Sequence, residues 1–330
     1  MAKPLISVVI TAYNRREYLR YAVKSVLNQT LDRNFYEVIV IKNFEDSYTD
    51  KLIEGVGRTI NVDIASIGAK IALGIRESEG EVVAFLEDDD LWHSRKLEHV
   101  AEAFRNNNDL MYYHHNTYAI DKYGNIIHDS LIERTNINNY VYASNEDEKM
   151  KVFKQYGWGL GLRNSSIAVR RDVYEKYAPI IRLLPDAVDV ALYLVALSVK
   201  GSIIHEPRRL MFFRIHETNT SSVRFAPQSE RLHRVAVNSV KHTIARYALA
   251  TIARHIKPQL TRYAGYDEAS IVAGILANWR GYTAVMSLNL LNHCKSLTCL
   301  ATAILGIINT ISPELTKRII TLYYTKGFRL

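Results

Sequence analysis

Four adjacent acidic residues form the part of the sequence best suited to chemistry. Glu87, Asp88, Asp89 and Asp90 directly follow Val82–Leu86, a short apolar run typical of a buried strand. Neighbouring carboxylates repel one another, so full hydration or a bound cation is expected to stabilise them. Hard divalent cations such as Mg²⁺ take carboxylate oxygens together with substrate phosphates. The cluster therefore indicates either a solvated acidic turn or a Mg²⁺ or Mn²⁺ site.

The elements before the cluster alternate between strands and helices. Apolar runs predict strands at Leu5–Ile10, Glu37–Ile41, Ile60–Ile64 and Val82–Leu86. Helical spacing predicts helices at Arg15–Gln29, Asp46–Val56 and Gly68–Ser78. Asn14 is the expected N-cap of the first helix. This alternation predicts an α/β fold with a mostly parallel sheet flanked by helices. Ligands of such sheets bind outside the carboxyl ends of strands, which favours the metal site.

The sequence after the cluster continues with mixed elements. Trp92 is expected to pack in the core behind the acidic residues. Further strands are predicted at Leu110–Ile120, Ser165–Val169 and Leu210–Ile215, and helices at Arg95–Arg105 and Asp186–Lys200. Asn136–Asn145 is polar and poorly patterned, which predicts a mobile loop, and Gly157–Gly161 predicts a flexible loop that carries Trp158.

Charge divides the chain near residue 225. Residues 225–330 hold 13 Lys/Arg against 4 Asp/Glu, whereas the first 224 residues hold 29 against 30. From Glu230 onward the apolar pattern is helical only. We therefore predict an α/β domain over 1–224 and a basic, all-helical region over 225–330. Such a region is expected to meet an anionic surface, either membrane or nucleic acid.

The C-terminal region includes an uncharged stretch. Ser296–Pro313 has no charge over 18 positions but contains Thr298, Thr302 and Asn309. A spanning helix needs about 20 predominantly apolar residues, so a buried or interfacial helix is predicted instead. The N-terminal sequence lacks a signal-peptide pattern, and the two cysteines of the chain, Cys294 and Cys299, are consistent with a reducing compartment. We expect a cytoplasmic protein, peripheral on the inner face of the membrane.

The first two-thirds of the chain resembles family 2 glycosyltransferases of the GT-A fold. The matching segments are Ser7–Arg15, Tyr36–Ile41, Gly80–Trp92 and Arg95–Glu98, with weaker matches at Ser165–Tyr174 and Phe213–Ser221. The resemblance implies an inverting, metal-dependent transfer of a sugar from a nucleotide-diphosphate sugar to a hydroxyl. The acceptor would be a glycan, a lipid-linked sugar or a surface polymer. Residues 1–120 would bind the nucleotide-sugar and residues 121–224 the acceptor.

On the donor side, the resemblance implies roles for the acidic cluster. It looks like the family's DxD motif, in which Asp88 would lie near the ribose. Asp89 and Asp90 would hold Mg²⁺ or Mn²⁺ against the diphosphate, while the role of Glu87 stays open. Loop residues Thr11, Ala12 and Tyr13 resemble the segment that wraps the nucleotide base, although a strand-to-helix turn with a core tyrosine also fits.

Each of the remaining candidates for donor binding could instead have an ordinary structural role. Arg15 and Lys70 would reach phosphate, or would be solvated surface residues. Lys42 and Asn43 occupy positions where the family usually carries an acidic pair. Asn43 still offers a carbonyl oxygen to a base N–H, whereas lysine has donors only. Asp46 lies nearby as a substitute, so the identity of the base stays open.

Acceptor chemistry requires a general base that removes the hydroxyl proton during attack. The resemblance places this base at the start of a helix, and Asp189 fits that spacing best, with Asp186 as the second candidate. Their structural alternatives are a helix dipole partner for Asp189 and an N-cap for Asp186.

Three further side chains complete the candidate site. Arg214 would pair with the diphosphate, and His216 would bind the metal or a phosphate, unless it is a structural histidine. Trp158 would stack on a sugar face of the acceptor.

Two other function classes compete with this enzyme. A degenerate transferase-like fold would bind a nucleotide or nucleic acid without chemistry. Against nucleic acid, an acidic cluster at the centre of the sheet would repel a polyanion. A dinucleotide-binding dehydrogenase would need a glycine-rich turn after the first strand, and Thr11–Arg16 contains no glycine. We therefore favour the glycosyltransferase.

Overall fold

The computed structural model describes residues 3–217, 219, 271, 275, 280–291 and 297–326. The chain divides into two compact units, Met1–Ile215 and His216–Leu330. The domain boundary predicted after residue 224 lies outside the described residues and stays a prediction.

A sheet dominates the described residues of the first unit. Its strands are β1 (Ile6–Thr11), β2 (Tyr36–Lys42), β3 (Gly57–Asn61), β4 (Val82–Glu87), β5 (Leu91–Trp92), β6 (Leu110–Ile120), β7 (Ile126–Ile127), β8 (Val141–Ala143), β9 (Ile167–Arg170) and β10 (Ser202–Arg214). The strand order is β3-β2-β1-β4-β9-β6-β10-β5, with β7 beside β6 and β8 beside β10. Most paired residues lie in the parallel ladders of β1 to β4 and of β6 with β10, whereas β9 is antiparallel to both of its neighbours. The predicted α/β class is confirmed.

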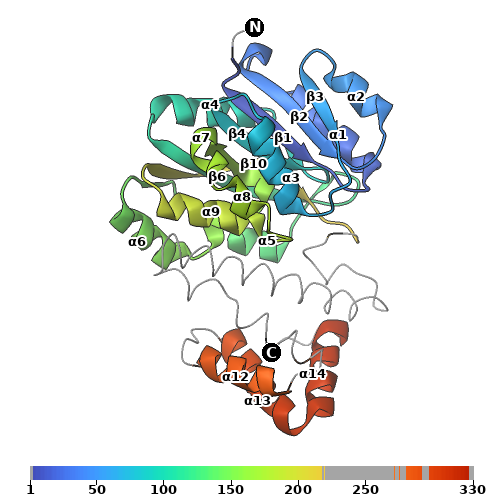
Figure 1. Ribbon diagram of the computed structural model, residues 1–330, viewed down its shortest axis with the longest axis vertical. Helices are drawn as coiled ribbons and strands as arrows, with labels where there is room; N and C mark the ends of the chain where they lie inside the picture. The colour runs from blue at the N-terminus through green and yellow to red at the C-terminus, as the bar shows by residue number, and fades with distance from the viewer. Residues whose placement is uncertain are drawn as a thin grey trace. The chain divides into compact units, whose positions relative to one another are not determined.

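Helices cover the sheet. They are α1 (Arg16–Leu27), α2 (Ser47–Ile53), α3 (Ile67–Glu77), α4 (Lys96–Asn106), α5 (Ser130–Thr135), α6 (Glu146–Tyr156), α7 (Arg171–Glu175), α8 (Ala178–Ile181) and α9 (Val188–Ser198). Short 3₁₀ turns lie at Arg33–Phe35, Gly159–Gly161 and Asn164–Ser166. Helix α3 packs against α8 and α9, and the three lie in front of the sheet in Figure 1.

The centre of the sheet explains the apolar runs in the sequence. Every residue of β1 is buried, and Val82–Leu86 of β4 lies beside it. A parallel strand covered on both faces needs apolar residues throughout, so these strands lack polar alternation. Trp92 is only 3% exposed, which confirms its predicted core position.

Several predicted strand boundaries were wrong, because pairing between strands, and not the local apolar pattern, sets where these strands lie. Strand β3 covers Gly57–Asn61 instead of Ile60–Ile64, because its register places Gly57 beside Val38 of β2. The stretch predicted as a mobile loop contains β8, a short strand that pairs with β10. Strand β10 begins eight positions before the predicted Leu210 and includes register shifts around Arg209.

The entry into α1 also differs from prediction. Arg15, not Asn14, is the N-cap, and its side chain does not cap the helix. Asn14 instead has a φ of 59°, a left-handed conformation that asparagine tolerates better than most residues. The chain therefore turns sharply between β1 and α1.

In the second unit, three helices are described: α12 (Arg280–Leu291), α13 (Leu297–Ile311) and α14 (Pro313–Lys326). Helices α12 and α13 approach closely at Gly306, where an added Cβ would lie 1.9 Å from Ser287 Oγ. Asn309 Nδ2 donates to Thr283 Oγ1 across the same pair at 3.2 Å. Over the described residues, every helix is too short or too polar to cross a membrane.

Candidate active site

The acidic cluster lies at the carboxyl end of β4, as the sequence predicts. Oxygens of Glu87, Asp89 and Asp90 all lie within 4.8 Å of one another. Asp88, Asp89 and Asp90 are at most 5% exposed. A solvated acidic turn is thereby excluded, since these carboxylates are buried.

Burial and mutual repulsion change the acidity of the cluster. Burial first, and then the neighbouring charge of Asp89, raise the pKa of Asp90 to about 7. Burial also raises the pKa of Asp88 to about 7, against the opposing attraction of Arg15. The pKa of Glu87 is raised well above its ordinary value, by burial first and then by Asp89. The folded protein therefore disfavours four ionised carboxylates unless positive charge is nearby.

One such charge comes from the chain itself. Arg15 Nη2 lies 2.8 Å from Asp88 Oδ1, and Arg15 Nη1 contacts Asp89 Oδ2. Burial lowers the pKa of Arg15, but the attraction of Asp89 and Asp88 outweighs it and the pKa is raised. Water or a bound cation was expected to balance the cluster, and the role of this arginine was not predicted. The surface interpretation of Arg15 was wrong.

Hydrogen bonds fix the direction of the carboxylates. Asp90 Oδ2 accepts from Ser165 Oγ at 2.6 Å, and its Oδ1 accepts from the Arg214 N–H at 3.1 Å. Glu87 Oε1 accepts from Asn164 Nδ2 at 3.2 Å. The orientation of these groups is thus set by the fold before any ligand binds.

The donor set fits a hard divalent cation. Three converging carboxylates supply the oxygen ligands that Mg²⁺ and Mn²⁺ prefer. Asn164 Oδ1 is buried close by, and within the described part of the chain it accepts no hydrogen bond. Glu87, whose role the sequence left open, belongs to this set together with Asp89 and Asp90.

The predicted base-binding loop lies beside the cluster. The Tyr13 N–H donates to Asp88 Oδ2 at 3.1 Å, while the Tyr13 side chain is 38% exposed. Lys70 Nζ donates to Ala12 O at 2.9 Å and lies 4.5 Å from the Tyr13 ring centroid. Lys70 is buried, so its surface interpretation was wrong, and burial lowers its pKa to about 8. Thr11 Oγ1 is buried, and it neither accepts nor donates a hydrogen bond among the described residues.

The unusual pair Lys42–Asn43 holds the local structure. Lys42 Nζ forms an ion pair with Asp50 at 2.9 Å. Asn43 Oδ1 accepts from the Asn14 N–H at 3.0 Å, and its Nδ2 donates to Asn14 Oδ1 at 2.8 Å. Asp46 caps α2 by accepting from Thr49. The proposed contacts of Asn43 or Asp46 with a base stay predictions.

Asp189 lies in the first turn of α9. Its Oδ2 accepts from the Arg163 N–H and its Oδ1 from the Val190 N–H, both at 2.8 Å. Asp186 Oδ1 accepts from the Ala187 N–H at 2.7 Å, but Ala187 is the N-cap, so the N-cap interpretation of Asp186 was wrong. Ala187 has a φ of 56°, a strained conformation for a residue other than glycine.

A segment that was predicted in part as a strand, but not as part of the site, joins the candidate base to the cluster. Within Arg163–Ser166, Arg163 holds Asp189, while Asn164 and Ser165 hold Glu87 and Asp90. The signal was a polar run directly before a buried strand. Because β9 is antiparallel to β4, the start of β9 meets the end of β4.

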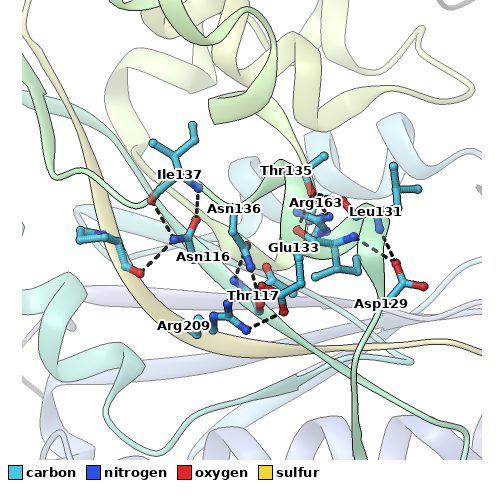
Figure 2. A network of polar contacts seen from close by, with 12 residues as sticks. Asn116, Thr117, Asp129, Leu131, Glu133, Thr135, Asn136, Ile137, Arg163 and Arg209 are labelled. Carbon is cyan, nitrogen blue, oxygen red and sulfur yellow. Dashed lines mark hydrogen bonds and ion pairs between the residues drawn. The ribbon is translucent and has the colours of Figure 1, made fainter.

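The Arg163 side chain is anchored to α5, as Figure 2 shows. Its Nη2 donates to Thr135 Oγ1 at 2.6 Å, and Arg163 itself has a φ of 68°. Glu133 of α5 accepts two hydrogen bonds from Arg209 of β10, at 2.8 and 2.6 Å. Asn136 pairs through its side chain with the main chain of Thr117, at 3.1 and 3.0 Å. This network fixes the strained loop whose Arg163 N–H holds Asp189.

The other predicted side chains serve the structure as well. Arg214 Nε donates to Asp89 O at 2.9 Å and its Nη1 to Lys122 O at 3.0 Å. Trp158 packs edge-on against Phe153, with ring centroids 4.8 Å apart. His216 begins the second unit, and its N–H donates to Asn219 Oδ1 at 2.6 Å. Their contacts with diphosphate, acceptor and metal stay predictions.

Several known proteins are similar to this chain in sequence. An uncharacterized glycosyltransferase of Nostoc sp. is 28% identical over 237 residues, which cover 68% of this chain and 69% of that protein. The poly(ribitol-phosphate) β-N-acetylglucosaminyltransferase TarP of Staphylococcus aureus is 30% identical over 165 residues. That match covers 46% of this chain and 49% of TarP, so this chain spans about half of that relative.

Solved structures show the same fold. The crystal structure of S. aureus TarS in complex with UDP-GlcNAc matches with a TM-score of 0.54 at 14% identity. The match covers 95% of this chain and 91% of that one. The pattern of glycosyl transferase family 2 matches residues 7–178, a segment that contains the acidic cluster and the start of β9. The chain belongs to glycosyl transferase family 2.

Proposed function

We propose that this glycosyltransferase moves a sugar from a nucleoside-diphosphate sugar to a hydroxyl group, with inversion and with a divalent cation. The observation that carries the proposal is the convergence of Glu87, Asp89 and Asp90 at the carboxyl end of β4. Buried carboxylates with raised pKa values are typical of a site completed by a cation.

Asp89 and Asp90, with Glu87, would hold Mg²⁺ or Mn²⁺. When bound, such a cation neutralises the charge that develops on the leaving diphosphate. Asp88 and the loop Thr11–Tyr13 would hold the nucleoside, with the exposed Tyr13 ring against the base.

Asp189 is the proposed general base. A bond forms between the acceptor oxygen and the anomeric carbon, and the bond from that carbon to the diphosphate oxygen breaks. The hydroxyl proton passes to the Asp189 carboxylate, and the bonding electrons leave with the diphosphate. Asp189 accepts hydrogen bonds from two main-chain N–H groups, which fix the direction of its carboxylate. Asp186 remains the second candidate.

The relatives suggest where to search for substrates. TarP is named for N-acetylglucosamine transfer to poly(ribitol phosphate), and TarS is described in complex with UDP-GlcNAc. We therefore propose UDP-GlcNAc as the first donor to test, and a glycan or surface polymer as acceptor. Because Lys42 and Asn43 stand where the family usually carries an acidic pair, GDP- and dTDP-sugars belong in the same panel.

A peripheral position at a cytoplasmic membrane surface is also proposed. The C-terminal region is basic, and α12 and α13 expose the apolar side chains Val285, Leu288, Leu300 and Ile304. Exposed apolar residues beside positive charge favour an anionic lipid surface.

The deciding experiment measures donor hydrolysis and transfer with Mn²⁺ and with EDTA. We expect activity that needs the cation and falls at least about a hundredfold in Asp89→Asn. Asp172→Asn changes an acidic residue outside the cluster and is the matched control. Full turnover by Asp89→Asn would contradict the metal role.

A further inference from the structure

We propose that the Arg15 guanidinium leaves Asp89 and binds the donor diphosphate when the divalent cation binds to the acidic cluster. The inference rests on the proposed function and adds to it a coupling between metal and nucleotide. Arg15 would then be a positioning residue that makes the two ligands bind together.

The guanidinium contacts a carboxylate that the cation would use. It contacts Asp89 Oδ2, and Asp89 is one of the three residues whose oxygens converge. The Arg15 side chain is 24% exposed, whereas those of Asp88 and Asp89 are 0% and 7% exposed. The arginine thus approaches the cluster from the solvent side. Two positive groups on one carboxylate repel each other, so cation and guanidinium compete for Asp89.

Arg15 can move without disrupting the fold. It is the N-cap residue before α1, and its side chain makes no capping hydrogen bond. In the described part of the chain, its polar side-chain contacts are the two with Asp88 and Asp89. A guanidinium matches a phosphate as well as a carboxylate, because both accept two parallel N–H groups. A diphosphate beside the cluster therefore offers Arg15 a replacement partner.

Competition and replacement together produce positive coupling. Without nucleotide, a cation that displaces Arg15 leaves the guanidinium without its carboxylate partners. With a nucleoside diphosphate present, the displaced guanidinium binds phosphate and so regains an anionic partner. Each ligand should therefore raise the affinity for the other by the same factor.

Manganese titrations of the full-length protein test the exchange, with binding followed by electron paramagnetic resonance. We expect Arg15→Gln to bind Mn²⁺ alone about tenfold more tightly than wild type. Arg16→Gln removes the same charge from the next residue, which is exposed and lies over the Phe44 ring, and should match wild type. UDP, GDP and ADP are then added in turn. The nucleotide that tightens Mn²⁺ binding in wild type should do so less in Arg15→Gln.

Each outcome separates the exchange from the function on which it rests. Equal Mn²⁺ affinity in wild type, Arg15→Gln and Arg16→Gln would overturn the exchange and leave the metal site standing. No Mn²⁺ binding by any protein, with or without nucleotide, would overturn the metal site and the exchange together. If Arg15→Gln does not fold, Arg15→Lys replaces it, and its Mn²⁺ affinity should lie above that of wild type.

Discussion

At the residue scale, main-chain N–H groups help to orient both the acidic cluster and Asp189. Asp90 accepts from the Ser165 hydroxyl and the main-chain N–H of Arg214, and Asp189 accepts from two main-chain N–H groups. Main-chain donors cannot be removed by substitution of their own side chains. Asp189→Asn keeps one acceptor oxygen and replaces the other with an N–H donor, so one of these main-chain N–H groups loses its acceptor.

Asp189→Asn tests the general base. We expect sugar transfer to fall by a factor of about 10² to 10⁴, because an amide cannot accept the hydroxyl proton. Nucleotide binding should be unchanged, since the donor is assigned to other residues. Asp186→Asn is the control, and steady-state transfer rates with thermal-shift nucleotide binding measure both. Loss of transfer in Asp186→Asn alone would reverse the assignment.

The raised pKa of Asp90 predicts a pH-dependent stability. The folded protein holds this proton up to about pH 7, whereas the unfolded chain releases it near the ordinary value of 3.8. Between these values the folded state binds more protons, so its stability falls as pH rises. The melting temperature of metal-free Asp90→Asn, relative to wild type, should therefore increase from pH 4.5 to pH 8. A difference independent of pH would contradict the raised pKa.

At the element scale, the loop before β9 holds the site together at the cost of backbone strain. Arg163 has a positive φ, and its main-chain N–H reaches Asp189 while Asn164 and Ser165 reach the cluster. The Glu133–Arg209 pair supports this loop through α5 (Figure 2). Strain at a functional site persists when surrounding contacts fix it.

Glycine should relieve that strain. We expect Arg163→Gly to be more stable than Arg163→Ala by about 1 kcal/mol, because only glycine adopts a positive φ without steric cost. At Lys151, exposed within α6, the order should reverse by about 1 kcal/mol. Chemical denaturation of the four variants measures both differences. Equal stability of the two Arg163 variants would contradict the strained backbone.

The strands that the sequence predicted well are those that are buried on both faces. Strands β1, β2 and β4 were predicted within two residues, because a strand covered on both faces reads as an uninterrupted apolar run. Strand β8 was missed, because its pairing with β10 fixes it within a polar stretch. Pairing between distant segments leaves no local pattern.

The candidate site divides in the same way. The acidic residues stand next to one another in the sequence and were visible at once. Arg15 and Ser165, which balance and orient them, are more than 70 positions away from the residues that they contact. Only the strand order brings them together, so the sequence alone indicated the acidic residues but not their partners.

At the scale of the whole molecule, a near-neutral catalytic unit is joined to a basic C-terminal region. Helix α14 exposes Arg318, and α12 and α13 expose apolar side chains. These features favour an enzyme that acts beside an anionic surface.

Sedimentation with liposomes tests this arrangement. We expect the full-length protein to sediment with vesicles that contain phosphatidylserine, and deletion of Ser296–Leu330 to release it. Arg318→Glu in the full chain should weaken binding, since a positive charge is reversed. Vesicles of phosphatidylcholine alone are the control. Unchanged sedimentation of the deletion variant would count against membrane association through this region.

The account depends above all on a divalent cation held by the buried carboxylates after β4. Crystals soaked with Mn²⁺ and UDP, measured at the manganese absorption edge, test it most directly. We predict an anomalous peak in contact with Asp89 and Asp90 and with the diphosphate oxygens. Bound UDP with no manganese at these carboxylates would contradict the central claim.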